Sequence, residues 1–189
     1  MVNWRNQLSS WFFFMKKIED ILNKRIMLLD GGMGTMIQEH KLGEDDYRSE
    51  LFKNHDSSLQ GNNDLLSITQ PKIIKDIHLK YLNAGSDIIE TNTFNANSIS
   101  QEDYHLQDKA FEMNLESAKI AREVVDEFNA KHNKQAFVCG SIGPTNRTAS
   151  LSPKVEDLSY RNVTFDQLYD AYYEQIDGLV QGGIDIVMI

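Results

Sequence analysis

The sequence predicts an α/β fold with a parallel sheet, and three observations support this prediction. Four short apolar segments have the character of buried strands: 26–29, 87–91, 136–141 and 184–189. Between them stand longer segments in which apolar residues recur at every third or fourth position, as in amphipathic helices. Glycines one or two residues before the second and fourth apolar segments allow tight returns from helix to strand. Parallel strands need crossover connections, so this alternation predicts a parallel sheet covered by helices.

The first strand-like segment, 26–29, is expected to be buried on both faces because four apolar residues stand in a row. Asp30 follows at the carboxyl end of this strand, and Gly31 and Gly32 then allow a sharp turn with free backbone N–H groups. One interpretation is that Asp30 binds an ammonium group while the glycine N–H groups bind a carboxylate, as a zwitterion requires. The other is that Asp30 caps the helix that follows.

The connection between the first and second strands is expected to be long. A short helix over 36–42 and an acidic loop over 43–46 lead into an excursion over 47–70 that shows no sustained period. A helix then begins at Pro71, which suits a first turn, and ends at Gly85. Its apolar stripe comprises Ile73, Ile74, Ile77, Tyr81 and Leu82.

The two later connections each place a polar stretch before a helix. A loop over 95–107 precedes a long helix over 108–131, and an excursion over 147–162 precedes a helix that starts at Thr164. Gln167 stands three residues after Thr164, which is the signature of a capping box. The predicted buried face of the first helix comprises Phe111, Leu115, Ala118, Ala121, Val125 and Phe128. The expected core stripe of the second comprises Phe165, Leu168, Tyr169, Tyr172, Ile176, Leu179 and Val180.

Composition and charge exclude several classes of protein. The 189 residues carry a net charge of −9 without a basic stripe, so we expect no nucleic-acid partner. A single cysteine excludes an internal disulfide and fits a reducing, cytoplasmic location. Residues 1–14 are rich in aromatic residues but too few to span a bilayer, and they lack a signal-cleavage site, so no membrane partner is expected. We interpret 1–14 as an extension outside the fold and 15–189 as the folded domain.

Two side chains with reactive potential are interpreted as structural. His78 lies within the helix that begins at Pro71, where a lone histidine is usually a core residue. Cys139 lies in the third strand-like segment and is most simply a small buried hydrophobe.

Two parallel architectures compete: a doubly wound open sheet and a (β/α)8 barrel. The first would make Gly32-Met33-Gly34 a dinucleotide-binding turn, but the third glycine of that motif is missing. The barrel explains more, because Asp30, 91–93 and 141–145 all follow strands and would meet at the end where barrel enzymes have their active sites. A full barrel takes about 250 residues. We therefore expect a (β/α)8 TIM-barrel type of which only the first four βα units, a half barrel, are present.

Four motifs in the sequence are similar to those of one enzyme family. They are LLDGGMGT at 28–35, GNNDLL at 61–66, ETNTF at 90–94 and GPTNRTASLSP at 143–153. In order and spacing, from about Met15 to Ile189, they resemble the N-terminal homocysteine-binding domain of cobalamin-dependent methionine synthases. The last motif, taken with the first, is specific. The resemblance implies methyl transfer to the homocysteine thiol, which gives methionine.

The same resemblance implies cofactors and partner domains. In complete members of the family, methylcobalamin is the immediate methyl donor, and methyltetrahydrofolate remethylates the cofactor, each bound in a later domain. Zinc activates the thiol and is held by cysteines on later strands, which Cys139 does not match. The chain is therefore expected to be a fragment, inactive alone, that binds neither zinc nor cobalamin through its own residues. The alternatives are a methyltransferase that uses betaine or S-methylmethionine, and a non-catalytic half barrel that pairs with itself.

The resemblance also assigns substrate-binding residues, but no catalytic residue and no metal ligand. Asp30 matches the residue that receives the homocysteine ammonium, and Gly31 and Gly32 belong to the turn beside it. The motifs at the next two strand ends contribute Glu90, Thr91, Asn92, Thr93 and Ser141. Strand alternation permits either Glu90 or Thr91 to face the mouth of the barrel.

Overall fold

The computed structural model describes residues 18–189, and the predicted extension over 1–14 lies outside them. The strands are β1 (Ile88–Glu90), β2 (Phe137–Ser141) and β3 (Ile186–Met188). The long helices are α5 (Pro71–Ala84), α7 (Ala110–His132) and α8 (Phe165–Gly182). The short helices are α2 (Met33–Gln38), α3 (Glu44–Arg48), α4 (Leu66–Thr69) and α6 (Ser98–Gln101). Single 3-10 turns are η1 (Asn63–Leu65), η2 (Glu102–Tyr104) and η3 (Gln107–Lys109).

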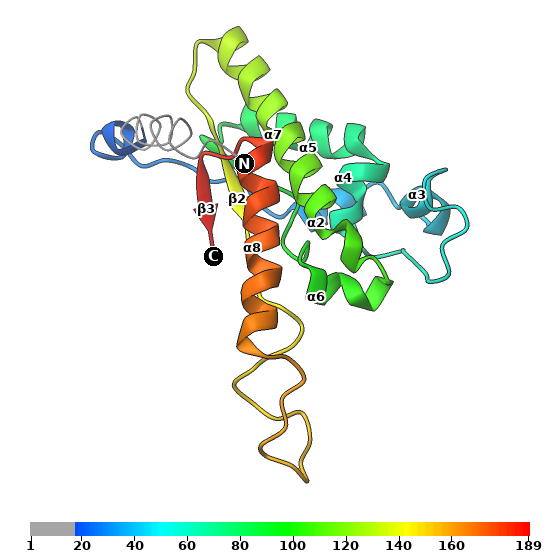
Figure 1. The fold of residues 1–189 in the computed structure, drawn as a ribbon. Helices are drawn as coiled ribbons and strands as arrows, with labels where there is room; N and C mark the ends of the chain where they lie inside the picture. Colours follow the sequence, from blue (N-terminus) through cyan, green and yellow to red (C-terminus); the bar gives the residue numbers. More distant parts are fainter. Residues whose placement is uncertain (1–17) are drawn as a thin grey trace.

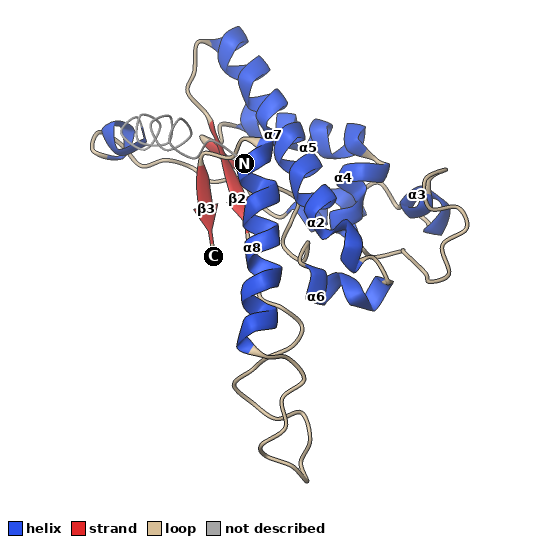
Figure 2. Ribbon diagram, in the orientation of Figure 1, coloured by secondary structure: helices blue, strands red, loops and turns tan. Residues whose placement is uncertain are grey.

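The strands form a parallel sheet in the order β1-β2-β3, which is also their order along the chain. Figures 1 and 2 show β2 and β3 side by side in this sheet. Segment 26–29 extends the sheet beside β1 through a parallel bridge between Leu29 and Ile88. A doubly wound sheet reverses its strand order at a switch point. The strands are parallel and alternate with helices, so the predicted α/β class is confirmed. The described strands show no reversal of order, which is consistent with part of a (β/α)8 barrel.

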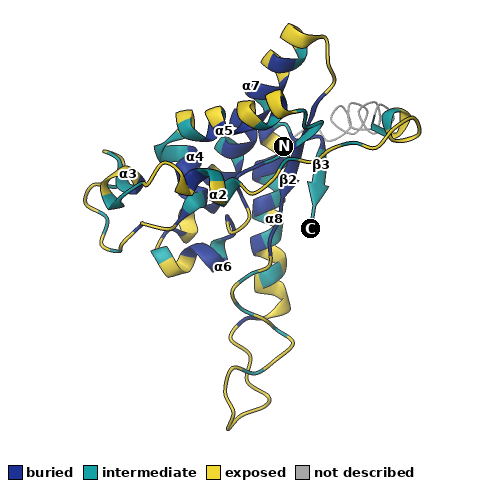
Figure 3. Cartoon of the chain, turned by 180° about the vertical axis from the view of Figure 1, so that it is seen from behind, coloured by how far each residue is buried: buried dark blue, intermediate teal, exposed yellow. Residues whose placement is uncertain are grey.

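The long helices cover one face of this sheet. Helix α5 packs on α7, and α7 packs on α8, in chain order. The core between helices and sheet contains Leu82 of α5, Ile89 and Val138 of the strands, Ala121 of α7 and Leu179 of α8. Figure 3 shows the buried inner sides of these helices and the exposed residues of the 147–162 excursion. The apolar stripes of the helices thus bury the face of the sheet that the helices cover.

Helices α7 and α8 approach closely because small residues lie between them. Gly178 and Gly182 of α8 face α7, and a Cβ atom at Gly182 would overlap the Cβ atom of Ala118. The predicted capping box fixes the start of α8. The Gln167 backbone N donates to Thr164 Oγ1 at 3.2 Å, and the Thr164 backbone N donates to Gln167 Oε1 at 2.9 Å.

The edges of the sheet differ from the sequence-based expectation. The prediction that 26–29 is buried on both faces is wrong, because Ile26 is 84% exposed and Leu28 is 58% exposed. This segment bridges β1 on one side and pairs with no described strand on the other. The predicted buried strand at 184–189 contains β3, which is half-buried because it also has one described partner. Between two partners, β2 is buried at every position.

Two predicted loops contain helices. Residues 44–48 form α3, whose first turn is capped because the Gly43 backbone N donates to Asp46 Oδ2 at 2.8 Å. The predicted loop over 95–107 contains α6 and η2. Asn97 caps α6 by accepting a hydrogen bond from the Ser100 backbone N at 2.8 Å. These helices are too short to show an apolar stripe and are marked only by their polar caps. Hydrophobic periodicity therefore does not predict them.

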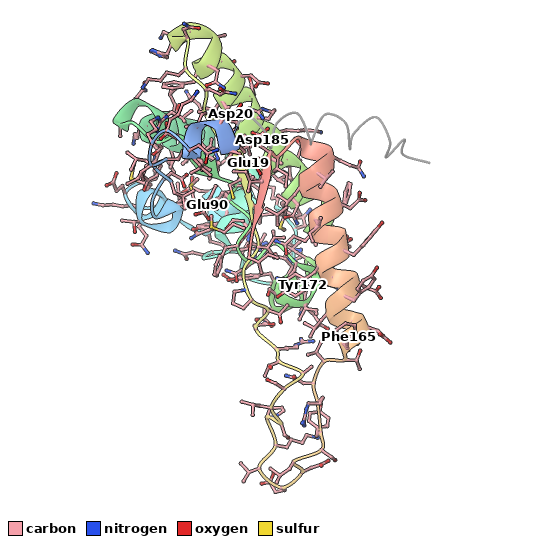
Figure 4. All side chains as sticks on the ribbon, turned by 90° about the vertical axis from the view of Figure 1, so that its left-hand side faces the viewer. Glu19, Asp20, Glu90, Phe165, Tyr172 and Asp185 are labelled. Atoms are coloured by element: carbon pink, nitrogen blue, oxygen red, sulfur yellow. The ribbon has the colours of Figure 1, made fainter. Side chains whose placement is uncertain are left out.

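The first turns of α8 also differ from the prediction. Phe165 and Tyr169 are 75% and 58% exposed, although the apolar stripe predicts that they are buried. Figure 4 shows Phe165 at the end of α8 that extends beyond the body of the molecule toward the 147–162 excursion. The stripe continues past the sheet, and no described element covers it there.

The predicted helix over 36–42 is observed as α2 at Met33–Gln38, and the excursion over 47–70 contains η1 and α4. Other predictions are confirmed. Helix α5 begins at Pro71 and ends before Gly85, which has a left-handed φ of 118°. His78 is fully buried, and burial lowers its pKa to about 4, so the imidazole is neutral. Cys139 is 2% exposed, and burial raises the pKa of its thiol to about 12. None of the helices described combines the length and hydropathy that a membrane span requires.

Candidate functional site

A cleft of about 500 Å³ opens at the carboxyl ends of the strands, and we call it the strand-end cleft. It is lined by 30–34, Asn63, Asp64, 90–95 and Ser141. These include all eight residues assigned to a substrate site from the sequence: Asp30, Gly31, Gly32, Glu90, Thr91, Asn92, Thr93 and Ser141. The fold therefore brings three separate predicted motifs to one place.

The parallel register explains why these residues meet. Glu90 pairs with Cys139, so β1 and β2 end at neighbouring levels. Ile89 and Val138 pack in the helix-covered core, and alternation therefore turns Glu90 and Cys139 toward the opposite face of the sheet. In a barrel this opposite face is the interior. Both Glu90 and the following Thr91 line the cleft, so alternation does not exclude either residue.

The Asp30 carboxyl has one hydrogen bond and one unpaired oxygen. Its Oδ2 accepts from the Glu90 backbone N at 3.0 Å, whereas Oδ1 is buried and has no hydrogen-bond partner among the described residues. Burial raises the pKa of Asp30 to about 7, and the Glu90 carboxylate adds to this effect. A cationic donor at Oδ1 would satisfy that oxygen and favour the ionised carboxylate.

The glycine turn lies against α5. Gly32 is the N-cap of α2 and no side chain caps this helix, so the interpretation of Asp30 as a helix cap is wrong. A Cβ atom at Gly31 would lie 3.2 Å from the Tyr81 hydroxyl oxygen, and that hydroxyl donates to Gly32 O at 3.3 Å. The close approach of Tyr81 therefore favours glycine at position 31. The N–H groups of Gly31 and Gly32 donate to no described residue.

Glu90 is held from the neighbouring strand. Ser141 Oγ donates to Glu90 Oε2 at 2.8 Å. The backbone N of Ser141 in turn donates to Thr91 Oγ1 at 3.0 Å, and Thr93 Oγ1 donates to Ser141 O at 2.7 Å. Thr93 has one hydroxyl proton, so Thr91 is the donor in the 2.6 Å contact between Thr91 Oγ1 and Thr93 Oγ1. These hydrogen bonds form a closed ring across the ends of β1 and β2, which we call the Thr-Thr-Ser ring.

Asn92 joins the strand end to the outer wall of the cleft. Its backbone N donates to Ser117 Oγ of α7 at 2.8 Å. Its side-chain Nδ2 donates to Asn63 O at 2.7 Å and to Ser67 Oγ at 3.3 Å. With these bonds made, the Asn92 side chain has a structural task in addition to lining the cleft.

The first excursion contributes cleft residues that were not predicted. Asn63 and Asp64 line the strand-end cleft, and both belong to the GNNDLL motif at 61–66, but neither is among the predicted substrate-binding residues. Asp64 is 5% exposed, its Oδ1 accepts from the Asn95 backbone N at 2.9 Å, and burial raises its pKa to about 6. Phe94, the last residue of the ETNTF motif, and the following Asn95 also line the cleft. The signal in the sequence that could have identified Asp64 is a carboxylate within the GNNDLL motif, although this motif does not follow a strand.

The cleft is acidic. Asp30, Asp64 and Glu90 line it, and no Lys, Arg or His is among its described lining residues. Such a lining favours ligands that carry a positive group. The described residues contain no cluster of three His, Cys, Asp or Glu side chains that would hold a metal ion. Cys139 does not fit a zinc ligand here, because its buried thiol resists ionisation.

Comparisons with known proteins identify the family of the chain and support its fold. Residues 27–189 match the family model for homocysteine S-methyltransferase. The metallated form of the homocysteine methyltransferase MmuM from Escherichia coli matches with a TM-score of 0.64 and 20% identity, over 89% of this chain and 55% of that one. The oxidised form matches with a TM-score of 0.63 and 19% identity, over 88% and 53%. The chain thus spans about half the length of these structures, which support the fold. By its family match, the chain belongs to the homocysteine S-methyltransferase family.

Proposed function

We propose that the strand-end cleft binds the amino-acid end of homocysteine for S-methylation to methionine. The observation that carries the proposal is the unpaired, buried Oδ1 of Asp30 in a cleft lined by three carboxylates and no described base. The homocysteine ammonium would donate to Oδ1. This contact replaces an unsatisfied oxygen with a charge-assisted hydrogen bond, which is among the stronger polar interactions in proteins.

Other groups would orient the rest of the amino-acid end. The free N–H groups of Gly31 and Gly32 suit the substrate carboxylate, as a backbone concavity does for other anions. Glu90, fixed by Ser141, adds negative charge beside the ammonium. Together these groups distinguish an α-amino acid from a simple thiol, because both its ammonium and its carboxylate have partners.

We propose methylcobalamin as the methyl donor, and methyltetrahydrofolate as the source that remethylates it, both bound by other domains of a larger protein. The support is the resemblance of the GNNDLL stretch at 61–66 and the GPTNRTASLSP stretch at 143–153 to cobalamin-dependent enzymes. Betaine and S-methylmethionine are the competing donors. Methyl transfer to L-homocysteine by the full-length protein, with each donor supplied separately, distinguishes these possibilities.

The family resemblance also implies zinc, which would keep the substrate thiol ionised and nucleophilic when bound. The residues described here do not fit that ion, since they form no three-ligand cluster and the Cys139 thiol is buried with a raised pKa. The role that the chain's own residues would have is to bind and orient the amino-acid end of the substrate.

Calorimetric titration of the chain with L-homocysteine tests the proposal. We expect saturable binding that Asp30→Asn weakens by about 50-fold, because the variant loses a charge-assisted hydrogen bond. Asp166→Asn is the control, because Asp166 is exposed in the first turn of α8. Equal affinity of wild type and Asp30→Asn would overturn the proposed role of the cleft.

A further inference from the structure

Gln175 is a fully buried polar side chain on α8, outside the strand-end cleft. Burying an amide is unfavourable unless its hydrogen bonds are made. The neighbouring buried positions on the same helix include Ala171, Gly178 and Leu179. An apolar residue would suit this face better, so a polar residue here calls for an explanation in terms of its contacts.

The Gln175 amide makes one hydrogen bond, and it reaches the cleft wall. Its Nε2 donates to Thr93 O at 2.8 Å, while its Oε1 is buried with no partner among the described residues. The close packing of α8 on α7 at Gly178, one turn further along, fixes the height of Gln175 against the sheet. Only the donor half of the amide is therefore used, and it holds Thr93, three residues after the end of β1.

Thr93 connects Gln175 to the carboxylate of Glu90, which lines the strand-end cleft together with Asp30. Thr93 belongs to the Thr-Thr-Ser ring, in which its hydroxyl donates to Ser141 O. The Ser141 hydroxyl donates to Glu90 Oε2. Separate hydrogen bonds thus link Gln175 to the Thr93 backbone, the Thr93 side chain to the Ser141 backbone, and the Ser141 side chain to Glu90. Figure 4 shows α8, marked by Tyr172, beside the sheet that carries Glu90.

We infer that Gln175 is a positioning residue that sets the Glu90 carboxylate in the strand-end cleft through Thr93 and the Thr-Thr-Ser ring. This inference deepens the proposed function and rests on it for its effect on homocysteine. Gln175 does not line the cleft and reaches it only through its hydrogen bond to Thr93. Its effect is to hold the backbone that follows β1 at the level where the Ser141 hydroxyl meets Glu90.

Two variants and a control test the inference. Gln175→Met keeps the length of the side chain but removes the donor. Gln175→Glu keeps the shape and donates to Thr93 O only when its carboxyl is protonated, which burial favours. The control is Gln181→Met on the same helix, because Gln181 is exposed and contacts only Asp177 of its own helix.

We expect Gln175→Met to weaken L-homocysteine binding by roughly tenfold and Gln181→Met to leave it unchanged. Gln175→Glu should match wild type at about pH 6 and lose affinity, relative to wild type at the same pH, when its carboxyl ionises at about pH 9. Wild-type affinity in a folded Gln175→Met protein would overturn the inference.

A second readout separates this inference from the proposed function. The carbon-13 chemical shift of the Glu90 carboxyl reports its hydrogen bond to Ser141 and needs no ligand. We expect this shift to change in Gln175→Met, or in Gln175→Glu at about pH 9 if the Met variant does not fold, and to stay constant in Gln181→Met. If wild type binds no homocysteine, the proposed function fails, and an unchanged Glu90 signal would then refute the positioning role separately.

Discussion

Glu44 and Asp30 are both carboxylates outside the apolar core, and their surroundings have opposite effects. Glu44 accepts hydrogen bonds from the Ser58 hydroxyl and the Leu59 and Gln60 backbone N atoms, and it pairs with Arg48 at 2.7 Å. Desolvation opposes them, but together these partners lower the pKa of Glu44 to about 2. Asp30 has one backbone donor and an unpaired oxygen, and burial raises its pKa to about 7.

The difference in pKa and in hydrogen-bond partners distinguishes a carboxylate with a structural role from one that is available to bind a ligand. Glu44 has its partners within the chain, so it fastens the excursion around 58–60 to α3. Asp30 lacks a described cationic partner, and the fold bears the cost of burying it. A ligand that supplies the missing hydrogen-bond donor would offset the unfavourable free energy of burying this carboxylate. A raised pKa together with an unpaired oxygen is therefore the feature that points to binding.

The largest expected effect is the pH dependence of homocysteine binding. The proposed contact with the ammonium requires the ionised form of Asp30, whose pKa is about 7 in the free protein. We expect affinity to rise about 100-fold between about pH 5 and pH 8, and the Asp30→Asn variant to lose this dependence. Calorimetric titrations across this range measure it. A flat profile for wild type would mean that Asp30 does not receive the ammonium.

The next largest effect concerns the stability that Glu44 provides. Replacing Glu44 with Gln removes the charge that three donors and Arg48 share, and we expect a loss of about 1–2 kcal/mol, since the site is partly exposed and screened. Because the folded pKa is lowered, this stability is present above the unfolded value of about 4.3 and is lost as pH falls toward 2. Urea unfolding at several pH values measures it. Equal stability of the two proteins at neutral pH would contradict the structural role.

Asp30 should show the opposite sign. Its folded pKa is raised, so the folded state holds the proton more tightly, and stability falls as pH rises from about 4 through 7. Asp30→Asn removes this penalty, and we expect a gain of about 1 kcal/mol at about pH 8 after allowing for partial exposure. Parallel denaturation curves of variant and wild type test it. A loss of stability at that pH would show that the ionised carboxylate has partners within the fold.

The smallest expected effect is that of Tyr81→Phe. The Tyr81 hydroxyl donates to Gly32 O at a long 3.3 Å, whereas its ring limits the space beside Gly31. We expect a change in unfolding free energy below about 0.5 kcal/mol and little change in homocysteine affinity. A large drop in affinity would assign the hydroxyl itself to the ligand.

Sequence reasoning succeeded where local chemistry and burial agree. Pro71 and Gly85 delimit a helix by their backbone properties alone, and β2 is buried throughout because both of its edges are paired. It failed where neighbours decide the outcome. Segment 26–29 is apolar yet exposed, and Phe165 continues a helical stripe beyond the sheet that would cover it.

The candidate site shows the same contrast between features that the sequence predicts and features that depend on neighbouring elements. The motifs at three strand ends gather because parallel strands end on one side of a sheet. Asp64 was missed because it lies in the excursion over 47–70, and the order of the strands does not predict where this excursion lies relative to the sheet. Gln175 reaches Thr93 across 82 positions, and a polar residue on a helix gives no sign in sequence that its partner is a strand end.

Carbon-13 titration of the Asp30 carboxyl, with and without L-homocysteine, tests the central claim most directly. The structure predicts a midpoint of about 7 in the free protein. Saturating homocysteine should lower it by more than about one unit, because the ammonium favours the ionised form. A midpoint of about 4 that the amino acid leaves unchanged would contradict both the burial of Asp30 and its role in binding.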